Sequence, residues 1–305
     1  MEIPKNLKTL YKHWETHTMQ PPVTSASELP EELIWFVSER MKIWEKKQNG
    51  ELPPYTKDAI LQKYRFCNIY RELDRQTINI HTHLKNLEKD FPLWLLNLAF
   101  HRFICKPTTV KKVGLLTFSS ENNEKVYRNL VNLPKPKYGT PYVFPISVIQ
   151  KSKYPTREEF FCLYLPKIIP IVSEKIKRFD NLTVNKALEM ILPSFGFNFR
   201  FHWTEILIDI AYQQPKLINL YKDFYIGPGA KPTALRLNPE ELPSNTVDQC
   251  VGTRIPSDYL LTYNDNPILL SAENWEGIFC EYRKYTNLKT GSGRKRIYRH
   301  DIKLN

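Results

Sequence analysis

Glycine is scarce in this sequence, with only ten glycines among 305 residues. Two of them flank Pro228 in the stretch DFYIGPGAKPTAL, residues 223–235. Proline fixes its own φ angle, and glycine lets a backbone turn sharply or approach a ligand closely. The stretch is therefore either a turn that connects two helices or a loop that holds a phosphate. Asp223 is the acidic residue at its start.

Cysteine pairs and long apolar runs are also missing. The five cysteines lie far apart and form no Cys-x-x-Cys pair, which excludes a disulfide framework and a zinc module and indicates a reducing compartment. The N-terminal residues carry no apolar signal core, and runs such as FPLWLLNLAF are too short to span a bilayer. We therefore expect a soluble, intracellular protein of the cytoplasm or nucleus with no membrane partner.

Several catalytic motifs are absent as well. The sequence has no G-x-x-x-x-G-K-[ST], no G-x-G-x-x-G, no G-x-S-x-G and no zinc-deaminase signature. His81 and His83 are two positions apart and diverge on a helix, so they do not suggest a metal site. These absences exclude a P-loop kinase. They lead us to predict no metal site and no cofactor, with metal dependence left open.

Positive charge and aromatic residues are abundant. Lys and Arg total 44 against 32 acidic residues, a formal net charge of +12, and aromatic residues make up 13% of the chain. Such a balance suits a polyanionic partner, and aromatic residues among basic ones suit base stacking and phosphate contact. A basic soluble protein with an aromatic core is the alternative. DNA is the partner that we predict.

The pattern of apolar residues and breakers predicts a mainly α protein. A leader and linker occupy residues 1–30, and a single domain occupies residues 31–305. Within it, residues 106–155 read as a small irregular or β insert and residues 286–305 as a basic C-terminal segment. Helices are expected at 27–47 (capped by Ser27), 58–87, 91–105, 156–179, 183–192 and 271–288, with another after 192.

The segment KYRFCNIYRELDRQT, residues 63–77, carries the first candidate site. If it is helical, polar side chains form a stripe along two neighbouring edges. Such a stripe can pair internally as surface ion pairs, or it can offer preorganised donors to a phosphate or a base edge. Both interpretations stay open. The edges carry Arg65, Asn68, Glu72 and Arg75, and Arg71 and Asp74.

Two further segments could contact DNA. LPSFGFNFRF, residues 192–201, has the outline of a helix-hairpin-helix turn, in which backbone amides bind a DNA phosphate. Ser194 stands where that motif usually has glycine, Gly196 follows, and an ordinary interhelical turn is the alternative. CEYRKYTNLKTGSGRKRIY, residues 280–298, has side chains at helical spacing and then a basic run. They are Glu281, Lys284 and Tyr285, and Arg294, Lys295 and Arg296.

Four segments taken together resemble one known family, the DNA base hypermodification proteins. They are SERMKIWEKKQNGELPPYTKDAILQKYRFCNIYRELDRQT, LPSFGFNFRFHWTEILIDI, GPGAKPTAL and FCEYRKYTNLKTGSGRKRIYR, and they span roughly residues 30–300. The family includes the helical domain of 5-hydroxymethyluracil DNA kinases and the α-glutamyl/putrescinyl thymine pyrophosphorylases. The R-F-x-N-x-x-R-E-x-D-R pattern is the most specific part of the match, and the hairpin is the least.

The resemblance implies a helix-hairpin-helix, DNA-glycosylase-like helical fold. It implies a transferase that replaces pyrophosphate on a 5-hydroxymethyluracil-derived thymine base by a small amine, with a 5-hydroxymethyluracil DNA kinase as a further partner. It assigns substrate or phosphate binding to Arg65, Asn68, Arg71, Arg75, Gly227, Pro228, Gly229 and Tyr285. From the hairpin outline and the basic run we predict DNA binding by Ser194, Gly196, Arg294, Lys295 and Arg296. The catalytic candidates are Asp74, Asp223, Glu281 and Lys284.

These residue types suit that chemistry. Arginines and backbone amides can hold a leaving pyrophosphate, and Asp223, Asp74 or Glu281 can take a proton from the amine. The base has to leave the stack to be reached. Two alternatives stay open: a base glycosylase, against which no lysine follows the hairpin at a Schiff-base position, and a non-catalytic DNA-binding module that serves a separate kinase. The sequence gives neither the amine nor the exact base.

Overall fold

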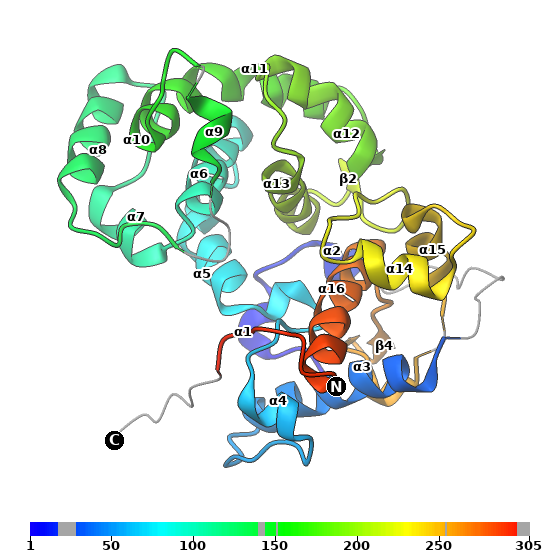
Figure 1. Cartoon of the computed structure of the whole chain (residues 1–305). Coiled ribbons are helices and arrows are strands. Elements are labelled where there is room, and N and C mark those ends of the chain that lie inside the picture. Colours follow the sequence, from blue (N-terminus) through cyan, green and yellow to red (C-terminus); the bar gives the residue numbers. More distant parts are fainter. Residues whose placement is uncertain (18–28, 140–143, 151, 254, 298–305) are drawn as a thin grey trace. The chain divides into compact units, whose positions relative to one another are not determined.

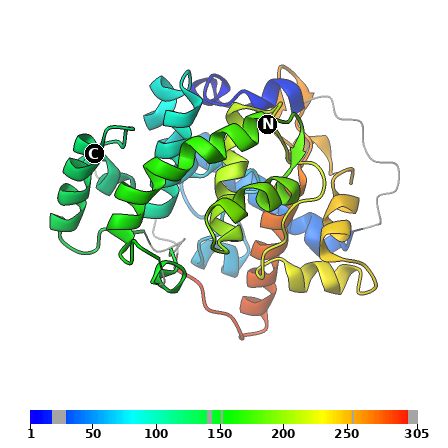
Figure 2. The ribbon, with the colours of Figure 1, turned by 90° about the horizontal axis from the view of Figure 1, so that it is seen from above.

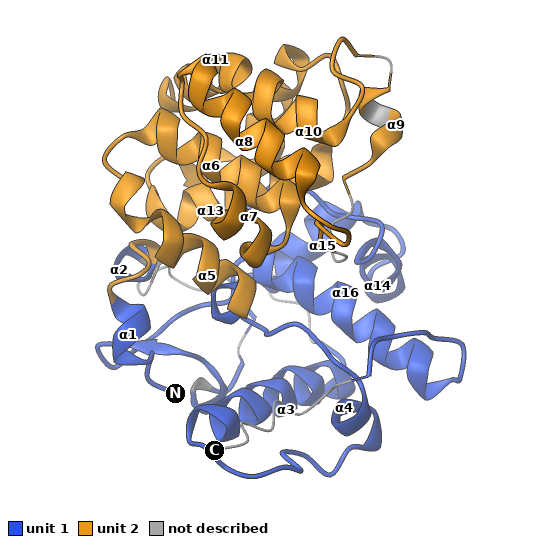
Figure 3. Cartoon of the chain, turned by 90° about the vertical axis from the view of Figure 1, so that its left-hand side faces the viewer, with its two compact units in different colours: residues 1–8, 14–74, 221–305 blue, residues 9–13, 75–220 orange. Residues whose placement is uncertain are grey.

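The computed structural model describes residues 1–17, 29–139, 144–150, 152–253 and 255–297 (Figure 1). The fold is mainly helical, as predicted. The chain forms two compact units, coloured separately in Figure 3. Unit 1 comprises residues 1–8, 14–74 and 221–305, and unit 2 comprises residues 9–13 and 75–220. The single domain over 31–305 stays a prediction.

Unit 1 is built around two 18-residue helices, α3 and α16. Acidic residues open α3 and lysines close it, which suits the helix dipole. Ser271 and Asn274 form a capping box that starts α16. The helix α16 packs against α3, α4, α14 and α15. The elements are α1 (Lys5–Lys8), α2 (His13–His17), α3 (Glu31–Gln48), α4 (Ala59–Lys63), η1 (Arg71–Leu73), α14 (Lys231–Leu237), α15 (Pro243–Cys250), η5 (Ser257–Tyr259), β3 (Thr262–Tyr263), β4 (Asn266–Pro267) and α16 (Ala272–Lys289).

Unit 2 is a helical array around α6 (Phe91–Ile104), which is buried along almost its whole length. Asp90 caps this helix, and Cys105 ends it with a left-handed φ of 54°. α6 packs against α11 and α13 (Figure 2). The other elements are α5 (Arg75–Leu84), η2 (Lys85–Leu87), α7 (Pro107–Val113), α8 (Ser120–Asn132), α9 (Ile146–Ile149), α10 (Arg157–Glu159), the π-helical turn η3 (Phe160–Tyr164), α11 (Leu165–Lys177), β1 (Leu182–Thr183), α12 (Val184–Ile191), η4 (Leu192–Ser194), α13 (Arg200–Gln213) and β2 (Ile218–Asn219).

Strands contribute little to either unit. In unit 2, β1 and β2 pair in parallel, with Leu182 opposite Ile218. In unit 1, β3 and β4 form an antiparallel pair across the left-handed residues Asn264 and Asp265. The β alternative for residues 106–155 is wrong within the described part of that range, which holds α7, α8 and α9 instead.

The predicted helices at 91–105, 183–192 and 271–288 are confirmed by α6, α12 and α16. The first predicted helix is α3, which begins at Glu31 after Pro30. The proposed cap, Ser27, lies outside the described residues, as does most of the predicted linker. Within the described ranges, no helix is both long and apolar enough to cross a membrane.

The predicted helix over residues 58–87 is wrong. The chain leaves α4 at Tyr64, which is extended, and becomes helical again only at η1 and α5. The backbone of the intervening segment is satisfied by partners far away in the sequence. Arg65 N–H donates to Arg296 O over 2.9 Å, and Tyr64 forms an antiparallel bridge with Ile297. These long-range bonds replace the i→i−4 bonds of a helix.

The hairpin segment joins α12 to α13 through η4 and residues 195–199. Gly196 has a φ of +68°, which glycine adopts without strain. Ser194 Oγ accepts a hydrogen bond of 2.7 Å from Lys175 Nζ, which also binds Met190 O at the end of α12. A lysine therefore holds the turn at the position where the helix-hairpin-helix pattern has glycine.

Candidate functional site

The buried carboxylate of Glu281 is the centre of a polar cluster in unit 1. Glu281 lies on α16 and is only 5% exposed. Its Oε1 accepts from Lys284 Nζ over 2.6 Å, and its Oε2 accepts from Lys295 Nζ over 2.6 Å. Burial alone raises the pKa of Glu281, but the charges of Lys295 and Lys284 outweigh it and hold that pKa below its ordinary value. Glu281 is therefore a fixed anion and a weak base.

The extended segment after α4 supplies the other side of this cluster. Cys67 N–H donates to Glu281 Oε2 over 3.1 Å, and the next amide, Asn68 N–H, donates to Asp74 Oδ1 over 3.1 Å. Asn68 Nδ2 also donates to Leu73 O, which closes the segment into a loop. Two successive backbone amides thus hold two carboxylates of different character.

Asp74 is the carboxylate without an ion pair in this cluster. It follows η1, is partly exposed, and its Oδ2 has no hydrogen-bond partner among the described residues. Burial raises the pKa of Asp74 to about 6, against the amide bond from Asn68 and the charge of Arg71. A carboxylate with a pKa near neutrality and a free oxygen can accept a proton from a bound substrate.

The two lysines around Glu281 differ in charge stability: burial lowers the pKa of Lys295, whereas the pKa of Lys284 is raised. The Glu281 charge outweighs burial and raises the pKa of Lys284, which is 38% exposed at its side chain. Lys295 lies 4.2 Å above the ring centroid of Phe66. Two ammonium groups face the carboxylate of Glu281, and that of Lys284 is accessible to a phosphate-bearing ligand.

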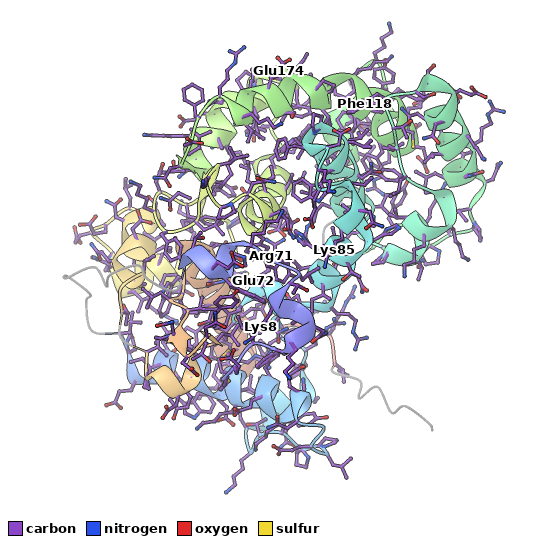
Figure 4. The ribbon with its side chains drawn as sticks, turned by 180° about the vertical axis from the view of Figure 1, so that it is seen from behind. Lys8, Arg71, Glu72, Lys85, Phe118 and Glu174 are labelled. Atoms are coloured by element: carbon purple, nitrogen blue, oxygen red, sulfur yellow. The ribbon has the colours of Figure 1, made fainter. Side chains whose placement is uncertain are left out.

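Arg65 is exposed beside this cluster, and Arg71 is partly exposed on η1, where Figure 4 labels it next to Glu72. Glu72 is buried and accepts a bond of 3.3 Å from Trp14 Nε1. Arg75 is the first residue of α5 and belongs to unit 2. The residues of the 63–77 motif therefore do not share helix edges as expected, although Asn68 and Asp74 meet directly.

Tyr285 has a structural contact. Its hydroxyl donates to Asp58 Oδ2 over 3.0 Å, while Asp58 Oδ1 caps α4 by accepting from Leu61 N–H. Tyr285 is 3% exposed. The side chain therefore ties α16 to the start of α4.

The stretch that contains Gly227, Pro228 and Gly229 packs against α16. Gly227 N–H donates to Glu276 Oε1 over 3.2 Å. A Cβ on Gly229 would lie 2.5 Å from Cys280 Sγ, so this position has no room for a side chain. Neither glycine has a positive φ. Close packing on α16 accounts for the glycines, and phosphate binding by the loop stays a prediction.

Asp223 has the left-handed backbone in this region, with a φ of 47°. Its N–H donates to both carboxylate oxygens of Asp248 on α15, over 2.9 and 3.1 Å. Burial raises the pKa of Asp248. These contacts fix Asp223 against α15, so the structure presents Asp74 as the better placed partner of the Glu281 cluster.

The basic run is part of the folded unit. Lys295 is bound to Glu281, and Arg296 pairs through its backbone with Arg65, while Arg294 is exposed.

The sequence analysis missed two residues that contribute to this site, Cys67 and Arg40. Arg40 Nη2 donates to the carbonyls of Phe66 and Cys67, over 3.2 and 3.0 Å. Their signal was weak, because Cys67 acts through its backbone and Arg40 lies 26 and 27 residues before the carbonyls that it binds.

Ser194 and Gly196 belong to unit 2, as does a pocket of about 510 Å³ lined by the segments 135–138 and 155–158. That pocket contains none of the predicted site residues. In the part of the chain that the structure describes, no three His, Cys, Asp or Glu side chains gather so as to hold a metal ion.

The family model for the helical domain of 5-hmdU DNA kinase matches residues 27–295. The chain therefore belongs to this family, in agreement with the resemblance seen in its motifs. A stretch of 90 residues is 34% identical to the 5-hmdU DNA kinase of Bacillus phage SP10 and covers 27% of this chain. It covers only 14% of that kinase. No solved structure matches the chain.

Proposed function

We propose that the protein is a DNA-modifying transferase that acts on pyrophosphorylated, 5-hydroxymethyluracil-derived thymine bases. It replaces the pyrophosphate by a small amine. Membership of the 5-hmdU DNA kinase helical-domain family supports the choice of base, and the +12 charge of the chain suits DNA. The observation that carries the proposal is the pair of successive amides, Cys67 and Asn68, that hold one lysine-bound carboxylate and one unpaired carboxylate.

The amine nitrogen attacks the methylene carbon attached to the base. A C–N bond forms, the C–O bond to pyrophosphate breaks, and its electron pair leaves on the pyrophosphate oxygen. Lys284 and Lys295 stabilise the negative charge that develops on this oxygen. Asp74 takes the proton that the nitrogen loses and later gives it to solvent. Glu281 positions the two lysines.

The helix-hairpin-helix, glycosylase-like fold belongs to the same proposal. In it, the α12–α13 turn with Ser194 and Gly196 contacts the DNA backbone, and Arg65 and Arg294 contact phosphates near the flipped base. A 5-hmdU DNA kinase prepares the substrate, as the name of the phage relative suggests. Such a kinase is the partner we propose.

The test is mass spectrometry of nucleosides from DNA that carries 5-hydroxymethyluracil. The DNA is treated with a matching kinase, this protein and a panel of amines, and each component is omitted in turn. We expect a new aminated nucleoside only when kinase, protein and amine are all present. DNA binding without any new nucleoside would contradict the transferase and favour the non-catalytic module, and release of free base would favour the glycosylase.

A further inference from the structure

Arg40 on α3 binds the extended segment that holds the carboxylates of Glu281 and Asp74. Its side chain is buried, and its Nη2 donates to Phe66 O over 3.2 Å and to Cys67 O over 3.0 Å. Its guanidinium carbon lies 5.9 Å from the ring centroid of Phe66. An arginine of α3 is therefore fixed against two consecutive carbonyls of this segment.

The first of these carbonyls belongs to the peptide group whose amide binds Glu281. In the peptide that joins Phe66 to Cys67, the carbonyl accepts from Arg40, and the Cys67 N–H donates to Glu281 Oε2 over 3.1 Å. This peptide is trans, and the carbonyl and amide of a planar trans peptide point in opposite directions. The peptide is therefore held at both ends, by a cation at its oxygen and by a carboxylate at its nitrogen.

The second carbonyl belongs to the next peptide, whose amide binds Asp74. Here Cys67 O accepts from Arg40, and Asn68 N–H donates to Asp74 Oδ1 over 3.1 Å. One nitrogen of the guanidinium is thus linked, through two successive peptides, to both carboxylates of the cluster. Hydrogen bonds in such a chain polarise one another, so a positive charge at the carbonyl makes the amide a stronger donor. Rotation of either peptide would break a bond at both of its ends.

The ionisation of Asp74 gives a way to measure this linkage. Burial raises the pKa of Asp74 to about 6, and the charge of Glu281 on α16 also raises it. The Asn68 amide, Arg71 on η1 and Arg40 on α3 act in the opposite direction. Loss of Arg40 would therefore affect Asp74 twice, because it removes a positive charge and releases the Asn68 amide.

We propose that Arg40 is a positioning residue for the amine transfer. It orients the amides of residues 67 and 68 so that Glu281 and Asp74 are held in place, and it acts through these amides rather than on the reacting atoms. The proposal rests on the proposed function, because it takes Asp74 as the proton acceptor. The alternative is an anchor that only ties the segment to α3, which would contribute to stability alone.

The experiment compares Arg40→Gln, which removes the charge, with Arg40→Lys, which keeps it. Arg157→Gln is the matched control, because Arg157 also donates two bonds to backbone, to Phe144 O over 3.2 and 2.7 Å, and also stands over an aromatic ring, that of Tyr138. Arg157 belongs to unit 2, whereas the Glu281 cluster belongs to unit 1. Denaturant unfolding shows how far each variant is destabilised.

The first readout is the pKa of Asp74 in the full chain, from carbon NMR of the aspartate carboxyl groups, with Asp74→Asn to identify the signal. We expect a pKa of about 6 in the wild type and in Arg157→Gln, and a value about one unit higher in Arg40→Gln. Arg40→Lys should lie between them. Equal values in Arg40→Gln and Arg157→Gln would overturn the proposal and leave the anchor. If Arg40→Gln does not fold, Arg40→Lys decides, and an unchanged pKa of Asp74 together with an unchanged kcat would overturn it.

The second readout is the nucleoside assay at saturating modified DNA. Arg40→Gln should lower kcat by about 10- to 100-fold with little change of KM, and the rise of kcat with pH should move upward together with the pKa of Asp74. The NMR readout requires no turnover, so the two proposals fail separately. A chain that makes the aminated nucleoside, while Arg40→Gln changes neither kcat nor the pKa of Asp74, has the proposed function without this role. A shifted pKa of Asp74 in a chain that makes no product supports the orientation by Arg40 and contradicts the transferase.

Discussion

Each unit contains a buried carboxylate held by two basic side chains, and the two clusters differ in their access to solvent. In unit 2, Asp209 is fully buried, and Arg102 Nε and Nη2 donate to its two oxygens over 2.5 Å. His81 Nε2 lies 3.1 Å from Asp209, and Gln213 Nε2 lies 3.0 Å from His81 Nδ1. In unit 1, Glu281 holds two lysines, one of which is more than one third exposed at its side chain.

The difference shows which cluster suits a ligand. The Asp209 network is sealed among helices, and the charge of Arg102 and the bond from His81 outweigh burial and lower the pKa of Asp209. A closed network of this kind specifies a packed core. The Glu281 cluster has an accessible lysine and a neighbouring carboxylate of raised pKa, which are features of a binding site.

The largest expected effect is a loss of folding stability when the carboxylate of the Asp209 network is neutralised, compared with the same change at Glu281. Asp209→Asn leaves the buried Arg102 charge without its anion and should destabilise the protein by about 3–5 kcal/mol. Glu281→Gln leaves Lys284, which already reaches solvent, and Lys295, so its cost should be smaller. Denaturant unfolding of both variants measures the difference. Equal losses of stability would remove the distinction between the clusters.

Asp74→Asn tests whether the Glu281 cluster, unlike the Asp209 network, contributes to the rate of amine transfer. It removes the proton acceptor while keeping the bond from Asn68, so turnover should fall by about 10²–10⁴ and DNA affinity should stay close to wild type. Asp223→Asn is the comparison, because its position is fixed against Asp248 rather than Glu281. The nucleoside assay gives both rates. If Asp223→Asn abolishes turnover and Asp74→Asn does not, the roles are reversed.

Gly229 tests whether the glycine-rich loop is shaped by packing or by a ligand. Gly229→Ala would place a methyl against Cys280 Sγ and should destabilise the protein by about 1–3 kcal/mol. Cys280→Ala makes room for this methyl, so the double variant should recover much of the loss. Thermal unfolding of the two single variants and the double variant measures this coupling. Additive losses would contradict packing as the reason for glycine.

A further difference between the two units concerns acid. Burial lowers the pKa of His101 to about 3 and that of His202 to about 4, both in unit 2. Because these values lie below the ordinary value of 6.5, the stability they represent is present above pH 6.5 and is lost as pH falls towards 3. Asp74 in unit 1 has a raised pKa, so its protonation on acidification favours the folded state. NMR titration should show both imidazoles still neutral at pH 5; protonation of either near pH 6.5 would contradict their burial.

The regular helices could be predicted from the sequence because the caps and the apolar spacing that define them involve residues close together in the chain. Asp90 caps α6 and Ser271 caps α16, and apolar residues follow at helical spacing. The segment between Tyr64 and Tyr70 could not be predicted, since its backbone is satisfied by residues more than 200 positions away, such as Glu281 and Arg296. Local propensity contains no information about such partners.

The candidate site was predicted in part for the same reason. Glu281 and Lys284 were recognised from helical spacing, and they do form an i, i+3 pair. The roles of their partners depend on tertiary contacts. Lys295 turns back onto Glu281, and Gly229 is small because Cys280 lies against it. These relations appear only when α16 is packed in its unit.

The most direct test of the account is the pH dependence of kcat for the amine transfer at saturating modified DNA, with two amines of different basicity. We predict a rise through about pH 6 that is the same for both amines and is missing in Asp74→Asn, because it reports the ionisation of Asp74. A limb that moves with the pKa of the amine and persists in Asp74→Asn would contradict the assignment of Asp74 as the proton acceptor of this site.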